Sequence, residues 1–145
     1  MDENILEWLL SDDTPEVRLR TLKEYQKLSD DDLEVIECKS KLLQSKIYER
    51  GLKKLKKDKP WEKFDAIMAF AEWGLTREDI GSDIDEEVFS LIQSTGFKML
   101  CGEPYLLRNL VKLGYYQVDI VKEEISCMLG KIKEDGGFGC ISSNK

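Results

Sequence analysis

Histidine is absent from this 145-residue sequence. Without it there is no Ser/His or Cys/His catalytic pair, no imidazole general base and no zinc site that depends on a His ligand. Any enzymatic chemistry would have to use carboxylates, lysine, tyrosine or cysteine. We assign no catalytic residue, no metal site and no cofactor to this sequence.

Long apolar segments are also missing. The longest runs span a few residues, as in 67–71, whereas a membrane-spanning helix needs about 20. The acidic start Met1–Asn4 differs from the basic start of a secretory signal. The four cysteines lack Cys-x-x-Cys spacing, which favours reduced and buried thiols, with a reactive Cys140 near the Gly136–Gly137 turn as the alternative. We therefore expect a cytoplasmic protein without a membrane span.

Positive charge is scarce, with 22 Lys and Arg residues against 29 Asp and Glu residues and a net charge of −7. Nucleic acids and anionic lipid surfaces bind proteins that carry a basic footprint. We expect neither as the principal partner. The one lysine-rich run, 53–59, could dock a phosphate, but lysines at a helix C-terminus also complement the helix dipole.

Helical periodicity runs from end to end, and the length suits a single domain, so we predict an all-α fold. Thr14-Pro15-Glu16 has the pattern of a helix start, and 29–32 is a second acidic cap. The region that follows is one helix or two helices broken near Ser45. We expect the tryptophans and phenylalanines to lie in the core.

The most informative feature is an internal repeat. An amphipathic helix that ends in an aromatic residue occurs three times, with the aromatics at Trp61, Phe97 and Phe138. After the first two, a second helix aligns without gaps, 66–80 against 106–120, with glycine at matching positions. We predict α/α helical hairpins stacked as a short solenoid or an incomplete toroid. Residues 1–47 would cap the array, and 48–145 would form the hairpins, the last one incomplete.

The segment Lys133–Gly139 resembles the Asp-Gly-Gly-Phe/Trp turn of the prenyltransferase and squalene-cyclase α/α-toroid superfamily. Degenerate copies occur at 93–97 and 57–61, so the resemblance covers about two thirds of the chain. The segment 13–18 also resembles the second helix of HEAT-type repeats. The family's zinc site of Asp, Cys and His does not carry over because histidine is missing. The segment 83–86 superficially resembles the Asp-rich acid motif of the squalene cyclases, and we interpret its acidic residues as a cap at the start of a helix.

In the toroid resemblance, the second helices line the concave face. This places near their N-terminal ends a set of candidate residues for binding a ligand or a partner: Lys63, Asp65, Glu103, Tyr105, Arg108 and Asn109. Polar residues in a first helical turn are also ordinary caps. Phe138 joins the candidates because the unfinished last repeat would leave it exposed.

Two functions follow as hypotheses. The first is a non-catalytic helical-repeat protein that binds a protein partner, or another copy of itself, through its concave face or its open C-terminal edge. The alternative is the N-terminal part or a remnant of a prenyltransferase-like or terpene-cyclase-like enzyme. That alternative predicts an apolar pocket for an isoprenoid ligand, with Arg108 or Lys63 at its mouth.

Overall fold

The computed structural model describes residues 3–95 and 103–137, and in these ranges the protein contains helices and no β-strand. The all-α prediction is confirmed. Within these ranges no helix is long and apolar enough to cross a membrane. The α-helices are α1 (Glu3–Leu9), α2 (Pro15–Arg20), α3 (Leu33–Leu43), α4 (Lys46–Leu55), α5 (Pro60–Glu72), α6 (Arg77–Ile80), α7 (Asp83–Thr95), α8 (Glu103–Lys112) and α9 (Asp119–Leu129). A π-helical turn, η1 (Thr21–Tyr25), extends α2, and a 3-10 turn, η3 (Tyr115–Gln117), precedes α9.

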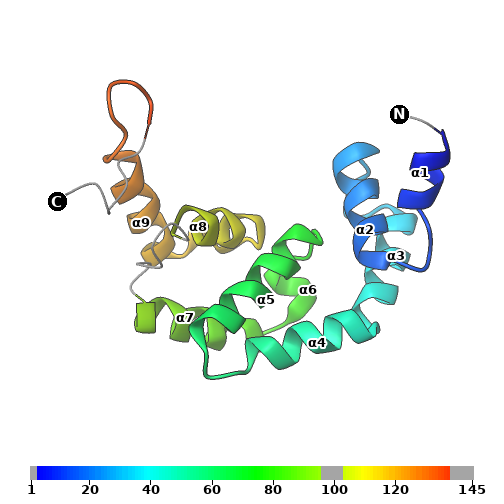
Figure 1. Ribbon diagram of the computed structural model, residues 1–145, viewed down its shortest axis with the longest axis horizontal. Helices are drawn as coiled ribbons and strands as arrows, with labels where there is room; N and C mark the ends of the chain where they lie inside the picture. The colour runs from blue at the N-terminus through cyan, green and yellow to red at the C-terminus, as the bar shows by residue number, and fades with distance from the viewer. Residues whose placement is uncertain (1–2, 96–102, 138–145) are drawn as a thin grey trace.

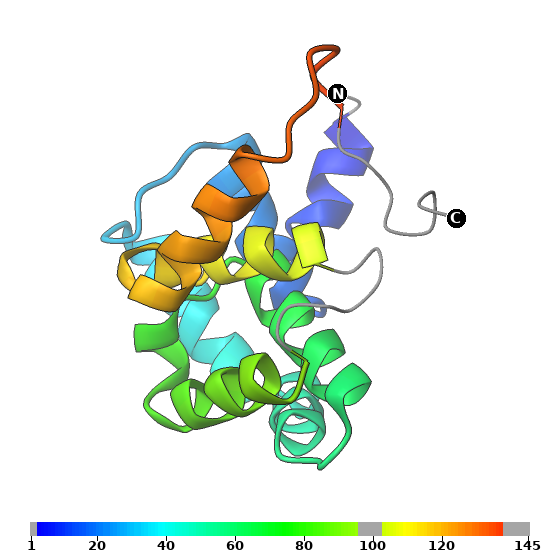
Figure 2. The same ribbon diagram turned by 90° about the vertical axis from the view of Figure 1, so that its left-hand side faces the viewer.

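The helices form an arc (Figure 1). Helices α1 to α3 lie at one end and α9 lies at the other, while α4 and α7 follow the lower edge of the view, with α5 and α8 above them. The same layering is visible from the side (Figure 2). Helix α5 is the centre of the arc, because α4, α7 and α8 all pack against it.

The long helical region before the repeats is two helices. Asp32 caps α3 by accepting a hydrogen bond from the Glu34 amide at 2.9 Å. Ser45 then caps α4, because its hydroxyl accepts a hydrogen bond from the Tyr48 amide at 3.2 Å. A side-chain cap satisfies an amide that has no partner inside the new helix, so the chain turns between Leu43 and Lys46.

The core is centred on Phe70 of α5, whose side chain is fully buried. Its ring lies 5.5 Å from that of Tyr48 and 5.6 Å from that of Trp73, centroid to centroid. Gly51 of α4 is required here, because a Cβ at this position would lie 2.6 Å from the ring of Phe70. The missing side chain lets α4 and α5 approach each other closely.

The prediction that the tryptophans belong to the core is wrong for Trp8 and Trp61, which are 67% and 56% exposed. Trp61 lies in the first turn of α5, where its ring makes an edge-to-face contact with that of Phe64 at 5.9 Å, centroid to centroid. Trp8 lies on the outer side of α1. Phe97, Phe138 and two of the cysteines lie outside the described residues.

The two described cysteines differ. Cys38 is buried as predicted, its thiol donates a hydrogen bond to the Pro15 carbonyl at 3.3 Å, and burial raises its pKa. Cys127 is exposed on α9, against the prediction of a buried thiol. Its helix lies at one end of the arc (Figure 1).

Candidate functional site

The candidate residues on α5 and α8 do not form one common site in the structure. Lys63 is buried between α5 and α7, where its ammonium group donates hydrogen bonds to the Glu87 carboxylate and, at 3.3 Å, to the Ser90 hydroxyl. Asp65 and Tyr105 are exposed. The hydrogen bonds of Lys63 therefore join α5 to α7 inside the fold.

Two candidates on α8 do lie together. Asn109 is completely buried, and its side-chain oxygen accepts a hydrogen bond from Arg108 at 3.3 Å. Its amide nitrogen has no hydrogen-bond partner within the described part of the chain. Glu103 begins α8, but its side chain lies outside the described structure, as does the whole of Phe138.

Arg108 belongs to an ion-pair network with Glu72, the last residue of α5. Three cations contact the Glu72 carboxylate: Arg108, Lys112 at 3.2 Å and Arg20 at 3.0 Å. Arg20 and Lys112 also pair with Glu24, at 3.0 and 3.7 Å. Hydrogen bonds, first from Arg108 and then from Lys112, hold the pKa of the Glu72 carboxyl below its usual range. The network joins α2 and η1 to α5 and α8.

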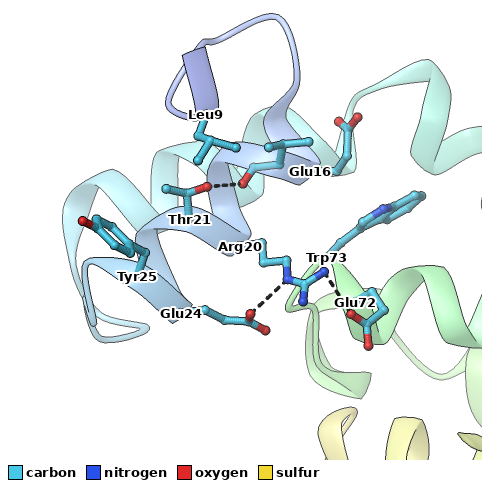
Figure 3. Close-up of a pocket in the computed structure, with 9 residues that line it drawn as sticks. Leu9, Glu16, Arg20, Thr21, Glu24, Tyr25, Glu72 and Trp73 are labelled. Atoms are coloured by element: carbon cyan, nitrogen blue, oxygen red, sulfur yellow. Dashed lines mark hydrogen bonds and ion pairs between the residues drawn. The ribbon is translucent and has the colours of Figure 1, made fainter. Parts of the chain in front are cut away.

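A hollow of about 630 Å³ opens beside this network, where α1, α2 and η1 face the end of α5 (Figure 3). Its lining combines apolar and charged side chains: Leu9, Glu16, Val17, Arg20, Thr21, Glu24, Tyr25, Glu72 and Trp73. Tyr25 and Trp73 lie on opposite sides of it, and Arg20 bridges Glu24 and Glu72 (Figure 3).

The π-helical turn η1 builds one wall of this hollow. In it the Gln26 amide donates to the Thr21 carbonyl at 3.0 Å, five residues back, and the Thr21 hydroxyl donates to the Val17 carbonyl at 2.9 Å. A π turn widens a helix locally and shifts the side chains that follow it around the axis. Three of the lining residues, Thr21, Glu24 and Tyr25, come from this turn.

The charge of the hollow is partly unbalanced. Arg20 pairs with both Glu24 and Glu72, whereas no cation in residues 3–95 or 103–137 pairs with Glu16. Glu16 is half-buried in the first turn of α2, where the helix dipole favours a carboxylate. The hollow therefore offers aromatic and aliphatic walls with one unpaired carboxylate, a combination that suits an apolar group beside a cation.

Sequence reasoning missed this hollow. Its residues come from 9–25 and from 72–73, and the first of these segments was expected only to cap the array. No sequence motif marks the site, because Arg20 and Glu72 are 52 positions apart and meet only when α2 packs near the end of α5. The one local signal was Tyr25, an aromatic residue in a polar stretch.

A second, smaller hollow of about 390 Å³ lies beside α3. Lys39 crosses it and bonds to Asp30 at 2.7 Å and to Asp79 at 3.2 Å, while Lys23 bonds to Asp30 at 2.9 Å. These charges satisfy one another and connect α3 to α6. Neither hollow is lined by Lys63 or Arg108, the cations expected at the mouth of an isoprenoid pocket.

Metal-ligating residues do not gather in the described ranges: no group of three or more Cys, Asp or Glu side chains there could hold a metal ion. No family model, curated protein or solved structure matches the chain. The resemblance to the prenyltransferase and squalene-cyclase repeats stays a prediction.

Proposed function

We propose that this chain is a non-catalytic helical-repeat binding protein, and that the hollow between α1, η1 and α5 binds a short segment of a partner protein. The observation that carries the proposal is the lining of this hollow: Tyr25 and Trp73 lie on opposite sides of it, and Glu16, which pairs with no cation of the described residues, is part of the lining. Its volume of about 630 Å³ falls in the range of pockets that take a few side chains of a ligand.

The packing of the second helices supports the repeat architecture in this proposal. Glu72 of α5 and Lys112 of α8 occupy equivalent positions of the aligned segments, and they form an ion pair at 3.2 Å. One residue beyond Lys112, the Leu113 carbonyl accepts a hydrogen bond from the Arg77 amide at 2.9 Å. Contacts between equivalent turns are what stacked repeats produce.

The ion-pair network supports a preformed site. Glu72 is held from both sides, by Arg20 of α2 and by Arg108 of α8, so the end of α5 is fixed against the wall that carries η1. When a site is already ordered, less of the binding free energy is lost to immobilising its side chains. We expect the partner segment to present an apolar side chain next to a lysine or arginine, which would pair with Glu16.

A peptide library displayed on phage tests this proposal with the full chain as bait. We expect selection of peptides that combine apolar residues with Lys or Arg. The variant Tyr25→Ala should weaken the selected peptides at least about tenfold, because aromatic side chains dominate such sites. Glu16→Lys should remove the preference for basic peptides.

The matched control is Tyr105→Ala, which removes another exposed tyrosine, from α8 (60% exposed, against 49% for Tyr25). It should leave peptide binding unchanged. Peptides that bind the wild type and Tyr25→Ala equally well would contradict the proposal, and so would a selection that enriches no peptide.

A further inference from the structure

Helix α4 carries a row of positive charges on its exposed side. Residues three or four positions apart share one face of a helix, and four exposed cations of α4 have this spacing. They form a basic stripe: Lys46, Arg50, Lys53 and Lys54. The buried residues of α4 lie on the opposite face, and the helix packs against α5. The stripe therefore faces solvent, and α4 follows one edge of the arc (Figure 1).

The helix dipole accounts for only half of the basic stripe. Lys53 and Lys54 lie in the last turn of α4, where the negative end of the dipole favours a cation. Lys46 is the first residue of the same helix, where the dipole disfavours a cation. A stabilising role at the helix end therefore explains two of the four cations but not the whole row.

Most of the basic stripe is not neutralised within the protein. Lys53 pairs with Glu49 at 2.6 Å, one turn back. No carboxylate in residues 3–95 or 103–137 forms an ion pair with Lys46, Arg50 or Lys54. Arg50 lies three or four positions from each other member of the stripe, and like charges at this spacing destabilise a helix. An anionic partner would remove this repulsion.

The basic stripe belongs to a longer basic segment in an acidic protein. Residues 46–59 contain seven Lys and Arg residues against two Asp and Glu residues, in a chain whose net charge is −7, so the rest of the chain carries −12. Interactions between exposed charges are largely screened beyond about 8 Å at physiological ionic strength. A short anionic ligand therefore senses mainly the stripe, whereas a nucleic acid or a membrane surface would also meet the acidic remainder. This charge distribution favours a short acidic segment of a protein.

An exposed tryptophan follows the basic segment. Trp61 lies in the first turn of α5 and is 56% exposed. Lys57 and Lys59 both pair with Glu62, the neighbour of Trp61, so these ion pairs hold the lysine-rich turn against the first turn of α5. Tryptophan is among the residues that contribute most to binding when a partner covers them. The surface thus combines a row of cations with an apolar anchor at one end.

We propose that the basic stripe and Trp61 bind an acidic segment of a partner protein that also carries an apolar side chain. Helix α4 has ten residues and is therefore about 15 Å long. An extended chain rises about 3.3 Å per residue, so about five residues cover the stripe. The carboxylates of the segment follow the cations, and its apolar residue covers Trp61. This surface shares no residue with the hollow that Tyr25 and Trp73 line.

Fluorescence anisotropy tests the proposal with the full chain and a labelled peptide of about ten residues, made of glutamates with leucines at one end. We expect a dissociation constant of the order of 10–100 µM at low salt, and severalfold weaker binding at about 0.2 M salt. The double variant Arg50→Glu, Lys54→Glu should bind this peptide at least about tenfold more weakly. Both residues are exposed, and circular dichroism should show unchanged helix content.

The matched control for charge is the double variant Lys122→Glu, Lys133→Glu. It changes the net charge by the same amount, at exposed positions on α9 and in the segment after it, and should leave the binding of the peptide unchanged. Trp61→Ser should weaken the leucine-containing peptide about fivefold and leave an all-glutamate peptide unaffected. Trp8→Ser, which removes another exposed tryptophan, should change neither.

Four results would overturn the proposal. The first is a wild type that does not bind the peptide at about 1 mM and low salt. The second is a charge reversal on α4 that weakens binding no more than its control on α9, and the third is a Trp61→Ser variant that binds both peptides as the wild type does. The fourth is tighter binding of single-stranded DNA or of phosphatidylserine vesicles, which would assign the basic stripe to a nucleic acid or to a membrane.

The hollow provides a separate readout. Tyr25→Ala should leave the binding of the glutamate peptide unchanged, because Tyr25 lies outside this surface. Loss of binding at the basic stripe would leave the proposed function intact, and loss of peptide binding at Tyr25 would leave this inference intact.

Discussion

Helices α5 and α8 align without gaps at an offset of 40 positions, but they have different surroundings. Ala71 of α5 is 2% exposed, whereas Val111, its equivalent on α8, is 42% exposed. Helix α5 is enclosed by α4, α7 and α8, while α8 lies nearer the end of the arc. The larger apolar residue is thus the more exposed one. At these aligned positions the place of the helix in the arc, and not the residue type, decides which side chain is buried.

The turns that follow the two helices diverge after the same glycine. Gly74 and Gly114 both adopt the left-handed conformation, with φ of 80° and 95°, which is common for a glycine just after a helix. After Gly74, Thr76 and Asp79 form a capping box that starts the short helix α6. After Gly114 the chain forms η3, and Asp119, the equivalent of Asp79, points to solvent at the start of α9. The two aligned segments therefore lead into different helix starts, that of α6 after Gly74 and that of α9 after Gly114.

Truncating the buried side chains at one pair of aligned positions, Phe70 and Leu110, should separate α5 and α8 most. Phe70→Ala should lower the free energy of unfolding by about 4 kcal/mol, and Leu110→Ala, at the equivalent position, by about 3 kcal/mol. The larger loss is expected at Phe70, because its ring fills the space between Gly51, Tyr48 and Trp73. Urea unfolding measures both. A greater loss for Leu110→Ala would show that α8, and not α5, is the centre of the core.

Substituting Gly74 or Gly114 should lower the free energy of unfolding by similar amounts, because both residues adopt the left-handed backbone conformation. Gly74→Ala and Gly114→Ala should each cost about 1–2 kcal/mol, since an L-residue is strained in the left-handed region. Gly130→Ala is the matched control: Gly130 has an ordinary helical φ of −67°, and its added Cβ would meet nothing closer than 3.6 Å. That control should be neutral or slightly stabilising. Thermal unfolding compares the three variants.

The smallest effect concerns the ion pair that joins the two equivalent positions, Glu72 and Lys112. Glu72 is 26% exposed, so Glu72→Gln should cost less than about 1 kcal/mol at neutral pH. The hydrogen bond from Arg108 lowers the pKa of Glu72 below 4.5 in the folded protein. Its stabilisation is therefore present above the pKa of the unfolded chain and is lost as pH falls through the folded-state value.

We expect the stability difference between wild type and Glu72→Gln to shrink as the pH is lowered from 6 through about 4. Chemical unfolding at a series of pH values measures it. Asp65→Asn, an exposed carboxylate on the same helix, should follow the wild type throughout. A difference that grows toward low pH would contradict the assignment of Glu72 as the paired carboxylate.

Much of the secondary structure was predictable, because its causes are local. The caps at Asp32 and Ser45 and the left-handed glycines depend on residues within a few positions of each other. No residue that lines the hollow was predicted, and of the ion-pair network beside it only one residue was. Arg108 was a candidate by its place in the second helix, but its partner Glu72 is 36 positions away, and no local pattern predicts that pairing.

Burial was the least predictable property. Lys63 and Asn109 were expected on a binding face and are buried, whereas Trp8 and Trp61 were expected in the core and are exposed. Hydrophobicity favours burial only if another helix covers the residue. The repeat pattern shows which face of a helix is apolar but not how many neighbours enclose it.

The sequence alone determined the all-α class and the helix starts at Pro15 and Leu33, because caps and backbone preferences act over a few residues, and it left the break at Ser45 as one of two alternatives. The tertiary structure decided which faces are enclosed, gathered three cations around Glu72, and left a hollow where η1 meets the end of α5. These features depend on the angles at which helices pack, and those angles are set by side chains far apart in the chain.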